Sequence, residues 1–124
     1  MKKIISTTNA PAAIGPYSQA VETGGTLYMS GQLPIDPATG EMPTTIEEQT
    51  ERVFANIGAI LAEAGYGFAD VVKSTVLLAD MADFGAMNAV YAKYYTGQMP
   101  ARIAYQVVAL PKGALVEIDV VAVK

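Results

Sequence analysis

Two charged residues in the last quarter of the chain lie in runs of apolar and β-branched residues, where a charge is unusual. Arg102 stands at the start of the run 103–110, Glu117 lies inside the run 115–123, and the turn-forming sequence Pro111-Lys112-Gly113 joins the two. Both runs predict strands, and the short connection suggests that the two strands are adjacent. A lone guanidinium beside so much apolar surface either forms a structural salt bridge, for instance with Glu117, or holds a carboxylate or phosphate through paired hydrogen bonds. The residue types alone slightly favour the salt bridge.

The composition restricts the chemistry that such residues can perform. The 124 residues predict one domain, residues 1–124, which is long enough to bury a hydrophobic core. The absence of cysteine excludes disulfides, thiolate metal sites and a cysteine nucleophile. The absence of histidine removes the most common general base and metal ligand. Any catalysis therefore depends on carboxylates, arginine, lysine, tyrosine, hydroxyls, backbone groups and water.

The charge balance argues against nucleic acid as a partner. The net charge is −4, whereas a nucleic-acid-binding surface needs a basic face. The residues after Met1-Lys2-Lys3 do not form the apolar core of a signal peptide, and no apolar run reaches the ~18 residues of a membrane span. We therefore expect a cytoplasmic protein that binds neither nucleic acid nor membrane.

The proportion of charged residues predicts an oligomer. About half of the residues (52%) are hydrophobic, and only 16% are charged, compared with about 25% in an average globular protein. A small domain has a large surface for its volume, so apolar surface should remain exposed after folding. An obligate oligomer would cover that surface; a monomer with a weakly charged surface is the alternative.

Apolar periodicity and turn signals predict the element order ββ(β)αβαββ. A capping box begins the first helix at Thr44 or Thr45, and Gly65 ends it. We expect a second helix that Asp83 caps and that ends near Gly97. Strands are expected at residues 2–7, 17–22, 26–30, 71–79, 103–110 and 115–123. This order is typical of an α+β domain in which a mixed β-sheet has two helices packed on one face.

Alternation along the last strand separates a core face from a second face that contains Glu117 and Asp119. The second face is more apolar than a solvated sheet surface should be, so neighbouring subunits should cover it. This places Glu117 at or near a subunit boundary. The predicted core residues are Val116, Ile118, Val120 and Ala122.

Several separated motifs resemble those of the Rid family of reactive-intermediate deaminases, also called YjgF-type proteins. The likeness covers essentially the whole chain, and the order and spacing of the motifs together make it specific. The motifs are Gly15-Pro16-Tyr17-Ser18-Gln19-Ala20, Ser30-Gly31-Gln32, residues 49–56, Met87-Asn88 with Tyr91, Pro100-Ala101-Arg102, Leu110-Pro111 and Val116-Glu117-Ile118.

The resemblance implies a chorismate-mutase-like fold and a homotrimer with three clefts between adjacent subunits. It implies an enzyme that hydrolyses short-lived enamines and imines, such as 2-aminoacrylate/2-iminopropanoate and 2-iminobutanoate, to 2-keto acids and ammonia. The family needs no metal or other cofactor. Pyridoxal-phosphate enzymes that act on serine or threonine release these intermediates, and they are the implied functional partners.

The resemblance also implies roles for individual residues. Arg102 matches the arginine that holds the substrate carboxylate, a task for which lysine is a poor replacement. Glu117 matches the glutamate that orients or activates the attacking water. Tyr17 matches a cleft tyrosine whose hydroxyl contacts substrate or water, and Gly31 lines the cleft and permits close approach of the backbone.

Ser30 and Asn88 fall on positions of the substrate-binding set. Each also has a plainer interpretation, Ser30 as the end of a strand and Asn88 as part of a helix surface. Some family members have a cysteine two residues after the site arginine, where this chain has Ala104. Hydrolysis requires no thiol, so activity should be kept while thiol-based redox switching is excluded.

Two other functions remain open from the sequence. A non-enzymatic trimeric module that senses small carboxylates would need Arg102 in the same cleft but not Glu117. Cleavage of RNA is associated with the wider family, but the acidic charge balance and the absence of histidine weigh against it.

Overall fold

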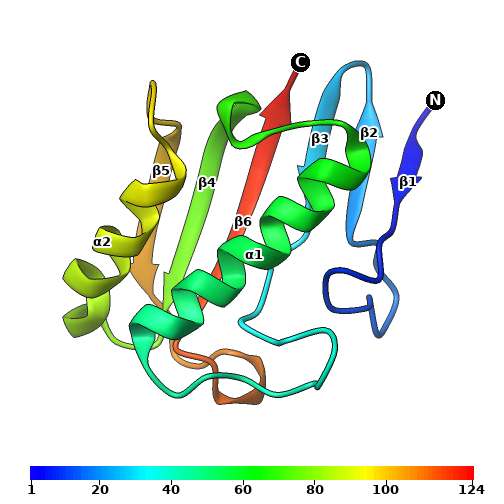
Figure 1. Ribbon diagram of the computed structural model, residues 1–124. Coiled ribbons are helices and arrows are strands. Elements are labelled where there is room, and N and C mark those ends of the chain that lie inside the picture. Colours follow the sequence, from blue (N-terminus) through cyan, green and yellow to red (C-terminus); the bar gives the residue numbers. More distant parts are fainter.

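The computed structural model describes all residues from 1 to 124 and shows a mixed six-stranded sheet with two helices on one face (Figure 1). The strand order is β1-β2-β3-β6-β4-β5; β4 and β5 are parallel, and all other neighbours are antiparallel. The predicted fold class is confirmed. The elements are β1 (Lys3–Ile5), β2 (Ala20–Thr23), β3 (Thr26–Met29), α1 (Ile46–Ala64), β4 (Val71–Leu78), α2 (Phe84–Tyr94), β5 (Ala101–Gln106) and β6 (Val116–Val123).

The connections between strands explain this order. Gly24 and Gly25 both have positive φ (55° and 81°), as the two-residue turn between β2 and β3 requires. Because α2 returns the chain across the sheet, β5 runs parallel to β4. β6 then enters the middle of the sheet, between β3 and β4.

The interpretation that the last two strands are neighbours is wrong, since β4 separates β5 from β6. The apolar pattern of a segment identifies a strand but contains no information about its neighbour. The connection formed by residues 107–115 is long enough to pass over one strand position.

Both ends of α1 have defined caps. The backbone N–H of Glu48 donates to the hydroxyl of Thr45 (3.2 Å), and that hydroxyl donates to the Glu48 carboxylate (3.0 Å). Thr45, and not Thr44, is therefore the N-cap of the predicted capping box. Gly65 ends the helix in the left-handed conformation (φ 82°), as predicted. No helix in the structure combines the length and apolar character needed to cross a membrane.

The start and end of α2 differ from the prediction. Asp83 occupies the N-cap position, but its side chain makes no capping hydrogen bond. The carboxylate of Asp80 instead accepts from the backbone N–H of Ala82 (2.9 Å) in the short 3₁₀ turn that precedes the helix. The helix ends at Tyr94 and does not continue to Gly97.

The core lies between the helices and the sheet face that they cover. Phe54 of α1 is fully buried and stacks on Tyr94 of α2, with ring centroids 4.5 Å apart, so aromatic contact joins the two helices. The predicted core face of β6 is confirmed, because each of its residues is at most 1% exposed: Val116, Ile118, Val120 and Ala122.

The other face of the sheet carries no helix (Figure 1). Large apolar side chains on this face are about half exposed, namely Tyr28, Ile103, Tyr105 and Val123. An open face of this composition is the kind of surface that another chain covers. It supports the predicted oligomer, and the homotrimer itself stays a prediction.

Candidate active site

The side chain of Glu117 lies on the open face of the sheet against the backbone of Gly31. Two backbone hydrogen bonds between Gln32 and Ile118 (2.8 and 3.2 Å) bring the segment after β3 alongside β6. A Cβ atom at position 31 would overlap Oε2 of Glu117 and lie 3.0 Å from its Cδ. Only glycine fits here without displacing the carboxylate, which explains physically why close backbone approach is possible at this position.

Burial raises the pKa of the Glu117 carboxyl group above its ordinary value, and the negative charge of Asp119 on the same face raises this pKa further. A carboxyl group with a raised pKa is a stronger base when ionised than an ordinary carboxylate, which suits a general acid or base. The structure contains no group of three or more acidic, histidine or cysteine side chains that could hold a metal ion.

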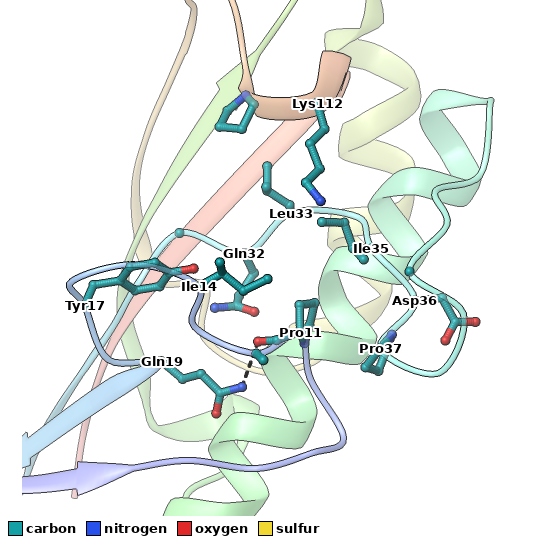
Figure 2. A pocket seen from close by; sticks show the side chains of 14 residues that line it. Pro11, Ile14, Tyr17, Gln19, Gln32, Leu33, Ile35, Asp36, Pro37 and Lys112 are labelled. Atoms are coloured by element: carbon teal, nitrogen blue, oxygen red, sulfur yellow. Dashed lines mark hydrogen bonds between the residues drawn. The ribbon is translucent and has the colours of Figure 1, made fainter.

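Gly31 also lines a pocket of about 590 Å³ (Figure 2). Its walls come from residues 11–19 before β2, residues 31–40 after β3, and the turn at Pro111 and Lys112. Tyr17 is about half exposed and directs its hydroxyl towards the cavity (Figure 2). The volume lies in the range of small-molecule sites. The structure therefore brings Tyr17 and Gly31 to one cavity, with Glu117 directly beside Gly31.

Side-chain hydrogen bonds hold the loop that carries Tyr17. The buried amide of Gln19 donates to the backbone carbonyl of Pro11 (2.8 Å). The hydroxyl of Ser30 donates to the backbone carbonyl of Ser18 (2.6 Å). Ser30, which the resemblance places in the substrate-binding set, is not among the residues that line the pocket, and its hydroxyl supports this loop instead.

Two amide side chains of α1 fix the other walls. Asn56 is fully buried, and its Nδ2 donates to the carbonyls of Leu33 (3.0 Å) and Ile35 (2.9 Å). Gln49 accepts from the N–H of Leu115 (2.8 Å), at the end of the turn that forms the third wall. Because these bonds join segments far apart in the sequence, the shape of the pocket is built into the fold.

Arg102 lies on the opposite side of the sheet, beneath α2. Its Nη1 donates to Oδ1 of Asn88 (2.6 Å), and the centre of its guanidinium lies 4.8 Å from the ring centroid of Tyr91 and 5.3 Å from that of Phe84. No carboxylate lies within 4.0 Å, since the one ion pair of the chain joins the exposed surfaces of α1 and α2. Neutral groups therefore orient the guanidinium, and its charge stays available for an anionic ligand.

Strand pairing shows that Arg102 and Glu117 cannot meet within one chain. On β4, Ser74 pairs with Arg102 and Leu77 pairs with Glu117. Ser74 is fully buried beneath the helices, whereas Leu77 belongs to the open face, and residues paired across a sheet share a face. A salt bridge between Arg102 and Glu117 of the same chain is therefore excluded. One chain alone also cannot place both side chains on one small ligand.

The predicted site residues thus form two groups. The first gathers at the pocket, with one residue as support, and the second lies between α2 and β5. The groups are Tyr17, Gly31 and Glu117 with Ser30 as support, and Arg102 with Asn88.

Sequence reasoning assigned no site role to three residues around these groups. Phe84 and Tyr91 contact Arg102, and their spacing from Asn88, four and three residues, puts all three on one face of α2. That spacing was an available signal for a shared target. Lys112 lines the pocket, and no sequence signal beyond its place in a turn pointed to it.

Comparison with known proteins decides the family. The profile of a family described as "Endoribonuclease L-PSP" matches residues 7–124. The chain belongs to this family, which includes the Rid proteins. The predicted family is therefore confirmed.

Individual relatives of the Rid family match the chain over its whole length. The 2-iminobutanoate/2-iminopropanoate deaminase of Mus musculus is 54% identical in an alignment that covers 100% of this chain and 93% of the relative. The crystal structure of the Rid-family protein YyfA from Yersinia pestis gives a TM-score of 0.97 at 48% identity, with all of both chains covered. The structure of E. coli TdcF with bound serine gives a TM-score of 0.94 at 40% identity, with 98% of each chain covered.

The raised pKa of Glu117 predicts a pH-dependent effect of Glu117→Gln. Because the folded chain binds this proton more tightly than the unfolded chain, protonation favours folding. Protonated Glu117 makes its full contribution to the free energy of unfolding below the pKa that this carboxyl group has in the unfolded chain. The contribution is lost as the pH rises through the raised pKa of the folded chain. We expect the stability of Glu117→Gln relative to wild type, measured by urea unfolding, to increase from about pH 4 to about pH 8. The control is the exposed Glu63→Gln, and a Glu117→Gln difference that is constant with pH would contradict a raised pKa at Glu117.

Proposed function

We propose that this protein hydrolyses short-lived 2-imino acids and their enamine tautomers, 2-aminoacrylate/2-iminopropanoate and 2-iminobutanoate, to 2-keto acids and ammonia. The mouse relative that bears the name of this activity aligns with the entire chain. The structural observation that carries the proposal is the guanidinium of Arg102, which neutral groups orient and no carboxylate neutralises. A 2-imino acid offers the planar carboxylate that such a fork binds.

The substrate site forms between two subunits of a homotrimer. The opposite placement of the two groups of residues and the apolar open face of the sheet both support this arrangement. A closed ring of three subunits repeats one contact three times. In each contact, one subunit contributes Arg102 and Asn88, and its neighbour contributes Tyr17, Gly31 and Glu117.

The reaction is an addition of water followed by loss of ammonia. Arg102 holds the substrate carboxylate and so fixes the C2=N bond beside Glu117 of the neighbour. Glu117 takes a proton from water as the water oxygen attacks C2 and passes this proton to nitrogen, which receives the C=N electron pair. The product is a carbinolamine, and Glu117 is ionised again. Transfer of the hydroxyl proton to nitrogen, again through Glu117, breaks the C2–N bond and leaves the 2-keto acid and ammonia. A carboxyl group with a raised pKa suits both proton transfers.

Asn88 acts through Arg102. Its Oδ1 accepts from Nη1 of Arg102 at 2.6 Å, so the amide sets the direction of the guanidinium without neutralising it. An aspartate at this position would pair with the guanidinium and compete with the substrate carboxylate.

The chemistry of the substrates also indicates where the protein acts. Pyridoxal-phosphate enzymes release 2-aminoacrylate from serine and the four-carbon enamine from threonine, so such enzymes supply the substrates. We place the protein beside them in the cytoplasm.

Removal of the Arg102 guanidinium tests the activity and its carboxylate anchor together. We expect Arg102→Ala to lower kcat/KM for 2-iminobutanoate by about a hundredfold, because a charge-assisted pair of hydrogen bonds is lost. A threonine dehydratase generates the imine, and semicarbazide traps what remains at each time. Arg102→Lys keeps the positive charge but not the planar guanidinium, so its kcat/KM should lie between those of wild type and Arg102→Ala. Hydrolysis by Arg102→Ala at the wild-type rate would refute this site.

Mixed trimers test whether two subunits build one site. Arg102→Ala and Glu117→Gln should each be nearly inactive alone. If the two residues act from different subunits, every trimer that contains both variants has one complete site among its three interfaces, so turnover should return to about a third of the wild-type value. Co-expression with two different affinity tags isolates the mixed trimers, and each variant carrying both tags in turn provides the control. No recovery of turnover in the mixed trimers would refute a site that combines Arg102 of one subunit with Glu117 of its neighbour.

A non-enzymatic module that binds small carboxylates is the second candidate, and the structure of TdcF with bound serine favours it, because that relative holds an amino acid. Such a module needs Arg102 but not a proton-transferring group. Glu117→Gln separates the two functions: we expect it to keep binding of 2-oxobutanoate, measured by calorimetry, and to lose turnover of 2-iminobutanoate. Unchanged turnover would favour the binding module.

Cleavage of RNA, which the family description names, is the weakest candidate for this chain. A net charge of −4 gives no basic surface for the phosphate backbone, and histidine is absent.

A further inference from the structure

Lys112 occupies an unusual and well-anchored position at the wall of the pocket. It is the only residue other than glycine with positive φ (58°), a conformation that a residue with a side chain adopts at an energetic cost. The flanking residues Leu110 and Ala114 are buried, and the N–H of Leu115 donates to the amide of Gln49 (2.8 Å). The surrounding structure thus enforces a backbone conformation that presents the lysine side chain to the pocket.

The ammonium group of Lys112 has no anionic partner in the chain, because the only ion pair lies elsewhere. Asp36 is the one other charged residue that lines the pocket. Its carboxylate turns away from the cavity (Figure 2) and accepts from the backbone N–H of Ala38 (2.8 Å). The pocket therefore contains one unpaired cation and no competing anion directed at it.

The remaining lining of the pocket suits a short apolar chain. Lys112 points towards Leu33 and Ile35, while the hydroxyl of Tyr17 enters from another side of the cavity (Figure 2). A volume of about 590 Å³ is in the range that holds drug-sized ligands. A four-carbon imino acid fills only a small part of it.

We propose that Lys112 is a specificity-determining residue that binds a second carboxylate, so that the protein also hydrolyses 2-imino dicarboxylates, the imino forms of acidic amino acids. This inference rests on the proposed function. Arg102 of the neighbouring subunit holds the carboxylate next to the imine, and Lys112 holds the carboxylate at the end of the side chain, with the methylene groups against the apolar wall. Water adds and ammonia leaves as for the smaller substrates, and the products from 2-iminoglutarate are 2-oxoglutarate and ammonia.

A comparison of substrate preference between wild type and variants tests this role. An amino-acid oxidase, with catalase present, generates 2-iminoglutarate or 2-iminobutanoate, and semicarbazide traps the remaining imine. We expect Lys112→Met to lower the ratio of kcat/KM for 2-iminoglutarate to that for 2-iminobutanoate about tenfold, as loss of one charged contact predicts. Added salt should reduce the ratio in wild type but not in Lys112→Met. Lys2→Met changes the net charge equally, lies outside the pocket, and should leave the ratio as in wild type.

The outcomes separate this inference from the proposed function. An unchanged ratio in Lys112→Met, or hydrolysis of 2-iminobutanoate but not of 2-iminoglutarate by wild type, would overturn the role of Lys112 alone. Hydrolysis of neither imine would overturn both. Calorimetry gives a readout that does not need turnover. The ratio of the affinity for 2-oxoglutarate to the affinity for 2-oxobutanoate should be higher in wild type than in Lys112→Met. An equal ratio in the two proteins would also overturn the inference.

Discussion

The placement of both helices on one face of the sheet is the constraint on which the rest of the structure depends. It gives every strand one face that the helices cover and one open face, so each residue of β4, β5 and β6 belongs to one of two environments. Arg102 falls on the covered side, where α2 surrounds its guanidinium, and Glu117 falls on the open side, where it lies against Gly31. The two charges that stand out in the sequence are therefore separated by the sheet itself.

This separation preserves the chemistry of both groups. An internal salt bridge would have lowered the pKa of the carboxyl group and neutralised the guanidinium. Instead, burial raises the pKa of Glu117, and a neutral amide with two aromatic rings orients Arg102. In the proposed inter-subunit site, the substrate carboxylate would be the anion that Arg102 binds, and Glu117 would keep the capacity to exchange a proton. The arrangement is suited to a small anionic substrate because Arg102 and Glu117 do not neutralise each other within one chain.

Local signals in the sequence were sufficient for much of the fold. A capping box at the start of α1, the Gly65 cap at its end and the core face of β6 follow from hydrogen bonds and alternation within a few residues, and they were predicted correctly. The sequence did not decide between Thr44 and Thr45 as the N-cap. The neighbour of β5 could not be predicted, because strand order depends on packing between segments far apart in the sequence. For the same reason the sequence suggested a contact between Arg102 and Glu117 that the fold excludes.

Site residues could be predicted where the residue type and its motif indicate the role. They could not be predicted where the role depends on the position of the residue in the folded chain. The resemblance identified Tyr17 and Gly31, which line one cavity, and Glu117, which lies beside Gly31. It did not distinguish Ser30, whose hydroxyl bonds a neighbouring loop. Lys112 became visible only through its backbone conformation and its position on the wall of the pocket.

Two of the motifs that reveal the family hold the pocket in shape. Gln19, Gln49 and Asn56 all lie in such motifs, and each bonds the backbone of a different wall. The bonds of these amides run to the backbone of the walls, so they define the shape of the cavity and say little about which ligand it holds. The choice among imines must then come from side chains on the walls that these amides hold. In this pocket those walls are mostly uncharged, and the exception that faces the cavity is a lysine.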